Sequence, residues 1–180
     1  MPTTRTRVLD AAIDLLGGQG LRALTHGRVD EAAGVPPGST SNYFRTRSAL
    51  LVGTAERVIE LEMPGVTAGL EPTTPEDLVD GLCALLDRTT GPQRTLTAAR
   101  LVLFLEASHH RALRDILDGG RAQMEAVVVT TLGRAGARDP GVAARALMAC
   151  LEGLILHRIT RDDRGDVRPT VEAVVRGLLA

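Results

Sequence analysis

The sequence predicts an all-α protein, with a small N-terminal helical domain followed by a larger helical domain. Apolar residues recur at intervals of three and four along most of the chain, as they do on one face of an amphipathic helix. Clusters of glycine and proline divide these stretches into segments of helical length. The richest β-branched stretch, residues 126–132, lies inside a longer helical pattern and therefore predicts no strand.

The first predicted helix covers residues 5–16, where apolar side chains form one stripe. Thr3 or Thr4 is placed to cap its start, because a threonine hydroxyl accepts a hydrogen bond from an exposed backbone N–H of the first turn. Gly17, Gly18 and Gly20 are expected to end it, since glycine commonly follows the last turn of a helix.

The segment from Thr25 to Leu51 is the most informative part of the chain. Thr25 stands at an N-cap position, and the sequence Ala33-Gly34-Val35 predicts a tight turn because Gly34 accepts the left-handed backbone that often follows a helix. Thr40 and Phe44, one turn apart, are expected to anchor the next helix on the core. A short helix with a small polar outer face fits the DNA major groove, so the segment predicts a helix-turn-helix.

This segment resembles the DNA-binding domain of TetR-family transcriptional regulators, closely over about the first 60 residues. The remaining chain is similar in length and helical pattern. The resemblance implies a three-helix DNA-binding domain and a C-terminal domain that dimerises and binds a small molecule, which usually releases a repressor from its operator. The features that carry the resemblance are Thr25, Ala33-Gly34-Val35, Gly38-Ser39, Tyr43-Phe44, Arg47 and Leu50-Leu51.

Ten residues are candidates for DNA contact. Asn42 can read adenine with two hydrogen bonds, Ser39 and Ser41 can reach a base or a phosphate, and Tyr43 can reach a phosphate. The helix start after Thr25 can bind a phosphate through its N–H groups. Ser41 departs from the family, which most often has an aromatic residue there, and simple solvation is the alternative for each polar side chain. The candidates are Thr25, His26, Arg28, Pro37, Gly38, Ser39, Ser41, Asn42, Tyr43 and Arg47.

The prolines and glycines of residues 64–75 predict a loop and a domain boundary, which divides the chain into residues 1–62 and 63–180. Thr46 is expected to cap a helix that runs to about Leu61, with Met63-Pro64-Gly65 as its stop. The helix at 93–108 is apolar almost all round and is expected to lie centrally. Further helices are predicted at about 76–88, 112–135, 142–160 and 169–179.

The helices at 112–135 and 142–160 carry more apolar residues than one buried face needs. Two such helices from each of two chains would form a four-helix bundle, as in a homodimer. Burial in the protein's own core explains the pattern equally well, and the family resemblance favours the dimer. The candidate interface residues are Met124, Val128, Leu147, Leu151, Leu154 and Arg158.

The resemblance also implies a small-molecule effector site in the C-terminal domain. Such sites are mostly apolar with a few polar groups. Internal ion pairs for the charged candidates and interface packing for His157 are the alternatives. The candidates are Arg100, Phe104, Glu106, His109, Met148, Glu152 and His157.

The composition bounds the other possibilities. The formal net charge is −1, so no broad nucleic-acid affinity is expected. All 21 basic residues are arginine, which suits bidentate contacts to phosphate and guanine. No catalytic residue, metal site or cofactor is predicted, because His109 and His110 point about 100° apart on a helix and no CxxC motif occurs. Two distant cysteines, no signal peptide and no long apolar run predict a cytoplasmic protein outside the membrane.

Two other classes of function remain open at this level. One is a helical small-molecule-binding protein or enzyme with a vestigial helix-turn-helix, which the net charge and Ser41 favour. The other is a dimeric scaffold that needs no ligand. The ordered pattern from Thr25 to Leu51 favours the regulator, whose partners would be a double-stranded palindromic operator, an unidentified effector and a second copy of the chain.

Overall fold

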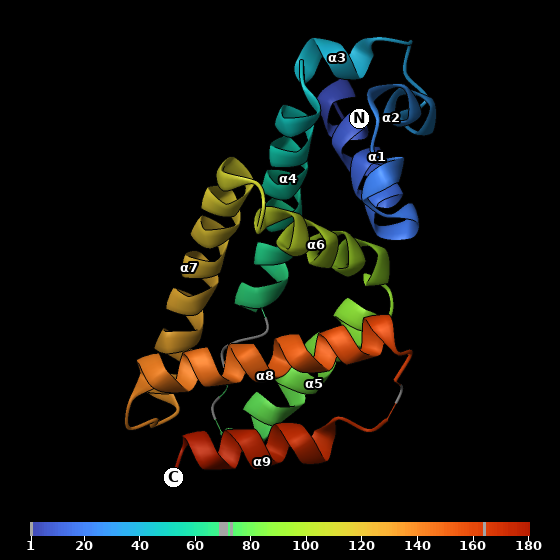
Figure 1. Cartoon of the computed structure of the whole chain (residues 1–180). Coiled ribbons are helices and arrows are strands. Elements are labelled where there is room, and N and C mark those ends of the chain that lie inside the picture. The colour runs from blue at the N-terminus through green and yellow to red at the C-terminus, as the bar shows by residue number, and fades with distance from the viewer. Residues whose placement is uncertain (1, 69–71, 73, 164) are drawn as a thin grey trace. The chain divides into compact units, whose positions relative to one another are not determined.

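The computed structural model describes residues 2–68, 72, 74–163 and 165–180. Within these ranges the chain forms nine α-helices, one 3-10 helix (η1) and no strand, which confirms the all-α prediction (Figure 1). The elements are α1 (Thr4–Gln19), η1 (Leu21–Ala23), α2 (His26–Ala33), α3 (Ser39–Tyr43), α4 (Arg47–Ala68), α5 (Pro75–Thr90), α6 (Arg94–Ala107), α7 (Arg111–Arg134), α8 (Pro140–Thr160) and α9 (Arg168–Leu178).

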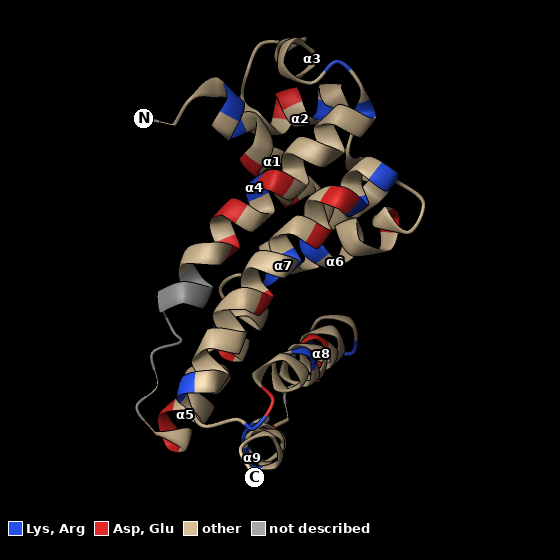
Figure 2. Cartoon of the chain, turned by 90° about the vertical axis from the view of Figure 1, so that its left-hand side faces the viewer, with Lys and Arg blue, Asp and Glu red and all other residues tan. Residues whose placement is uncertain are grey.

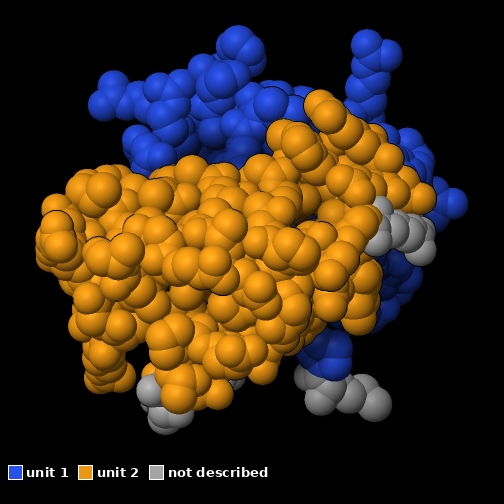
Figure 3. All heavy atoms as spheres, turned by 90° about the horizontal axis from the view of Figure 1, so that it is seen from below, with its two compact units in different colours: residues 1–61, 94–119 blue, residues 62–93, 120–180 orange. Residues whose placement is uncertain are grey.

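The chain divides into two compact units (Figure 3). Unit 1 contains residues 1–61 and 94–119, and unit 2 contains residues 62–93 and 120–180. Each unit has its own apolar core, and α6 is packed with the N-terminal helices although the loop predicted at 64–75 precedes it in sequence. Part of that predicted loop, residues 69–71 and 73, lies outside the described residues, and the boundary at 62/63 stays a prediction.

Helix α1 begins as the sequence predicts, because the Thr3 side chain accepts a hydrogen bond from the Thr6 N–H. Of the three glycines predicted to end α1, Gly20 does so, as the C-cap with φ of 78°, whereas Gly17 and Gly18 lie inside the helix, which continues to Gln19. Gly17 instead allows a close approach: a Cβ atom built there would lie 2.0 Å from the carbonyl oxygen of Thr95 at the start of α6. The glycine therefore serves contact between α1 and α6 within unit 1, not helix termination.

Helix α4 also outlasts its predicted end, because Pro64 lies inside it and the helix continues to Ala68. Proline removes one N–H from the hydrogen-bond series of a helix, which weakens the helix locally without necessarily ending it. The start is as predicted, with the Thr46 hydroxyl accepting from the Ala49 N–H at 3.0 Å.

Helix α6 is only partly central. Ala99 and Leu103 are buried in the core of unit 1, but Leu105 is 76 % exposed. Helix α6 is thus apolar on almost every face, but only one of its faces is buried in the core. Basic and acidic positions are interspersed along the helices (Figure 2).

In unit 2, α5 begins with a reciprocal cap in which the Thr74 hydroxyl and the Asp77 carboxylate each bond the other residue's backbone N–H. Leu78, Leu82 and Leu86 then face the core that α5 shares with α8 and α9. Cys83 and Cys150 are free and half-buried, and burial raises the pKa of both thiols. No helix in the described part of the chain is both long and apolar enough to cross a bilayer.

Candidate DNA interface

The turn between α2 and α3 has the predicted geometry. The Thr25 hydroxyl caps α2 by accepting from the Arg28 N–H at 3.4 Å. The helix ends at Gly34, whose backbone is left-handed with φ of 60°, a conformation that glycine adopts without steric cost. Val35 then donates its N–H to the Asp30 carbonyl at 3.0 Å and packs its side chain against the core. The reading of Ala33-Gly34-Val35 as a tight turn is confirmed.

Helix α3 presents one face to the core and the other to solvent. Thr40 and Phe44 are 0 % and 6 % exposed and form the inner anchor, as predicted. Ser41, Asn42 and Tyr43 are exposed, with 48 % of Tyr43 accessible. A surface helix with short polar side chains outward can approach base edges in the major groove.

The start of α3 is held by its own chain. Gly38 precedes the helix with φ of 88°, and the Ser39 hydroxyl donates to the Pro36 carbonyl at 2.6 Å. Pro37 is exposed beside it. The hydroxyl of Ser39 keeps its acceptor lone pairs, so it still has capacity for a base or a phosphate.

Three of the basic candidates have partners within unit 1. His26 donates from Nε2 to the Phe44 carbonyl at 2.6 Å. Arg28 donates through Nη2 to the Gln19 side chain. Arg47 donates to the Leu24 and Leu21 carbonyls at 3.3 and 2.8 Å. The guanidinium groups of Arg28 and Arg47 keep further donors, and these bonds fix where each of them lies.

Two contributors to the turn were missed by sequence reasoning. Asp30 is 4 % exposed and accepts hydrogen bonds from Gly38 and Thr40. Arg7 of α1 donates to the carbonyls of Ala33 and Gly34 at 2.6 and 2.9 Å, at the end of α2. Neither contact follows from helical periodicity, because each joins residues at least eight positions apart.

The seven effector candidates are divided between the units. Arg100 lies over the Phe104 ring at 5.4 Å, and both belong to unit 1 with Glu106 and the exposed His109. The other three candidates belong to unit 2. There Met148 is buried, Glu152 accepts from Arg121 at 3.3 Å, and His157 is exposed.

Unit 2 also has a surface groove that none of the effector candidates line. Its volume is about 480 Å³. Val79 of α5 and Val175 and Leu179 at the α9 side give it an apolar base, and Glu76 and Glu172 add two carboxylates. Both carboxylates pair with Arg168, at 3.7 and 3.2 Å, and the same guanidinium also pairs with Asp80.

The predicted interface residues lie largely inside unit 2. Val128, Leu147 and Leu151 are buried in its core, and Met124 and Leu154 pack against it. Their role in a dimer stays a prediction.

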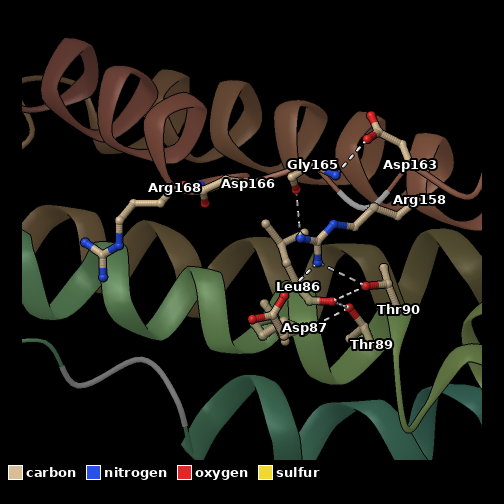
Figure 4. Close-up of polar contacts among 10 residues, drawn as sticks. Leu86, Asp87, Thr89, Thr90, Arg158, Asp163, Gly165, Asp166 and Arg168 are labelled. Carbon is tan, nitrogen blue, oxygen red and sulfur yellow. Dashed lines mark hydrogen bonds and ion pairs between the residues drawn. The ribbon is translucent and has the colours of Figure 1, made fainter.

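Arg158 likewise joins elements within unit 2. It donates to the Asp87 carboxylate at 2.7 Å, the Thr90 hydroxyl at 3.3 Å and the Gly165 carbonyl at 3.3 Å (Figure 4). The guanidinium thus connects α8 to α5 and to the segment before α9. Only 14 % of the side chain is exposed.

Comparison with known proteins identifies relatives along the chain. The family model for bacterial regulatory proteins of the tetR family matches residues 8–53, and the model for the tetracyclin repressor-like C-terminal domain matches residues 73–180. The HTH-type transcriptional regulator BetI of Rhizobium meliloti (strain 1021) is 29 % identical over 117 residues, which are 64 % of this chain. The match spans 58 % of that relative's own length.

Solved structures are similar over nearly the whole chain. A member of the TetR family from Streptomyces coelicolor A3 has a TM-score of 0.80 and 30 % identity, with 99 % of each chain covered. The multidrug binding protein EbrR complexed with ethidium has a TM-score of 0.76 and 32 % identity, with 98 % of each chain covered.

Proposed function

The chain belongs to the TetR family of bacterial regulatory proteins, and we propose that it is a ligand-responsive repressor. In this proposal a homodimer binds a palindromic operator, and a small molecule releases it. The two recognition helices of such a dimer must match half-sites about 34–36 Å apart. The ligand acts by changing that spacing.

The observation that carries the proposal is the division of α3 into two faces. Thr40 and Phe44 fix the helix inward, while Asn42 and Tyr43 stand exposed beside Ser41. Asn42 would supply base reading, and Tyr43 and the start of α2 would supply phosphate contacts. Because the chain carries a formal net charge of −1, specific contacts contribute more here than general attraction to DNA.

The dimer would use the outer face of α8, not the residues that the sequence singled out. Leu147 and Leu151 already fill the chain's own core. The exposed side of α8 nevertheless remains apolar, with Val142 and Leu156 53 % and 44 % exposed. Small residues lie between these two on the same side, at Ala146, Ala149 and Gly153. Such a stripe lets a second helix approach closely, as in a helical bundle.

The effector class is constrained by the scarcity of aromatic residues. The chain has two phenylalanines, one tyrosine and no tryptophan. Phe44 is buried in unit 1 and Tyr43 lies on α3, so stacking on a flat ligand depends on Phe104. EbrR has been solved with ethidium bound. For this chain we expect an effector held mainly by aliphatic contacts and by polar groups such as Glu152.

Selection from a random duplex library, followed by gel shift, tests the proposal. We expect enrichment of a palindrome whose binding weakens with salt. Asn42→Ala and Tyr43→Ala should each reduce affinity for that duplex about tenfold, the loss of about 1.4 kcal/mol expected for a good base or phosphate contact. Thr170→Ala, at an exposed position of α9, is the matched control.

A second candidate is a helical ligand-binding protein that no longer binds DNA. The net charge of −1 and the internal engagement of Arg28 and Arg47 favour it. Failure to enrich any duplex, with and without candidate ligands, would establish this alternative over the repressor.

A further inference from the structure

Asp30 is a buried carboxylate to which DNA recognition by the outer face of α3 assigns no role. It lies on α2 and is 4 % exposed. Its Oδ1 accepts from the Thr40 N–H at 2.7 Å and from the Thr40 hydroxyl at 2.6 Å. Its Oδ2 accepts from the Gly38 N–H at 2.7 Å. All three donors belong to the start of the recognition helix.

The carboxylate is charged in this setting. Burial alone would raise the pKa of Asp30, but the hydrogen bonds from Thr40 and Gly38, with the charge of nearby His26, outweigh burial and lower the pKa below its ordinary value. An ionised carboxylate accepts hydrogen bonds through both oxygens, and these charge-assisted bonds are about twice as strong as neutral ones. Asp30 is therefore a strong acceptor rather than a passive core residue.

Helix α3 depends on outside contacts for its orientation. It contains five residues, far fewer than an isolated helix needs in water. Pro36 and Pro37 precede it, and Gly38 makes no side-chain cap for it. Because its own hydrogen bonds are few, its direction is determined by the groups that hold its ends.

Two side chains of helix α2 contact the two ends of α3. Asp30 binds the first turn of α3, and His26, four residues earlier on the same side of α2, donates to the Phe44 carbonyl at the far end at 2.6 Å. Side chains four positions apart on a helix lie one above the other. Asp30 and His26 therefore fix α3 at both of its ends.

We propose that Asp30 is a positioning residue for operator discrimination, holding the recognition helix in the one orientation that aligns its outer side chains with base edges. The inference rests on the proposed DNA-binding function. Because the carboxylate uses the Gly38 and Thr40 amides, these amides are not offered to a phosphate. Reading of the operator therefore falls to side chains, among them Ser39, Asn42 and Tyr43, whose reach depends on the angle of α3.

The first test compares specific with non-specific binding. The probes are the duplex that the wild type selects from a random library and a scrambled duplex of the same length. We expect Asp30→Asn to weaken binding to the selected duplex at least about tenfold and to change binding to the scrambled duplex less than about threefold, because the amide nitrogen that replaces one carboxylate oxygen cannot accept a hydrogen bond from the start of α3. A merely structural role would weaken both bindings together as folded protein is lost.

Variants at Thr40 keep the test decisive if Asp30→Asn does not fold. Thr40→Val removes the hydroxyl that bonds Asp30 with little change of shape, and Thr40→Ser keeps it. We expect Thr40→Val to lose discrimination and Thr40→Ser to retain it. Equal discrimination by these two variants, or an unchanged ratio in a folded Asp30→Asn, overturns the proposal.

An arm without DNA separates this inference from the proposed function. Hydrogen exchange of the Gly38 and Thr40 amides should be slow in the wild type and at least about tenfold faster in Asp30→Asn, since opening then costs less. If the wild type selects no duplex, the proposed function fails and with it any role in discrimination. If it selects one but these amides exchange freely in the wild type, Asp30 is not the group that holds α3.

Discussion

Two adjacent glycines in α1 should respond to the same substitution with opposite signs. Gly17 and Gly18 both lie in the last turns of α1. At Gly18 no atom lies within 4 Å of an added Cβ, whereas at Gly17 the added Cβ would meet the Thr95 carbonyl oxygen at 2.0 Å and its carbon at 2.9 Å. Ordinary van der Waals contact begins at 3.4 Å, so the start of α6 must move by more than an ångström.

The magnitudes follow from this geometry. Replacing a helical glycine by alanine gains about 0.5–1 kcal/mol of folding free energy through helix propensity, which is the whole effect expected for Gly18→Ala. Gly17→Ala has the same gain, but overpacking against a backbone carbonyl costs about 1–3 kcal/mol, and the carbonyl cannot rotate away as a side chain would. The two variants should therefore differ by about 1–3 kcal/mol in the free energy of unfolding.

Thermal unfolding followed by circular dichroism measures the difference. For a chain of this size, 1 kcal/mol shifts Tm by about 2–4 °C. Gly18→Ala should melt above the wild type and Gly17→Ala below it. A Gly17→Ala protein as stable as Gly18→Ala would refute the close packing of α1 on α6 within unit 1.

Three further predictions concern single side chains. Tyr43→Phe should weaken binding to the selected duplex about twofold to tenfold and leave Tm unchanged, because it removes one exposed hydroxyl. Arg158→Met should lower the free energy of unfolding by about 1–3 kcal/mol in urea titrations, mainly through lost hydrogen bonds, since Asp87 is 70 % exposed and its ion pair is well screened. Asp14→Asn should stabilise the protein at neutral pH, because partial desolvation of this exposed side chain and the nearby Asp10 raise the pKa of Asp14 and so disfavour its charged form in the folded state. That gain should disappear in melts recorded below the pKa of an unfolded-chain aspartate, where both states are protonated.

The parts of the fold that sequence predicts well are those with local causes. A threonine cap, a glycine in the left-handed region and an apolar pair one turn apart each involve residues within a few positions. Thr25, Gly34 and the pair Thr40 and Phe44 accordingly lie where the sequence placed them. Gly17 and Pro64 were misread because a glycine or a proline has more than one use. Only the partner across the fold distinguishes helix termination from close packing.

The candidate interface illustrates a second limit of periodicity. Helix α8 is apolar around most of its circumference, so spacing alone cannot say which residues its own chain covers. Leu147 and Leu151 form the inner face, and Val142 and Leu156 lie on the outer one. The proposed dimer therefore keeps α8, one of the two helices predicted for the interface, and uses other residues of it.

The helix-turn-helix is stabilised by hydrogen bonds to its helix ends from residues distant in sequence, so local sequence patterns do not predict them. The carbonyls at the end of α2 are bonded by Arg7 from α1, and the amides at the start of α3 are bonded by Asp30 from α2. A cation at a helix C-terminus and an anion at a helix N-terminus are each the sign that the helix dipole favours. The turn thus gains two favourable charge placements from outside itself, which leaves the side chains of α3 free of a structural task on their exposed face. Arg7 and Asp30 stabilise the turn, whereas the outer side chains of α3 are the ones proposed to contact DNA. Substitutions on the outer face of α3 should therefore alter operator preference without unfolding the motif.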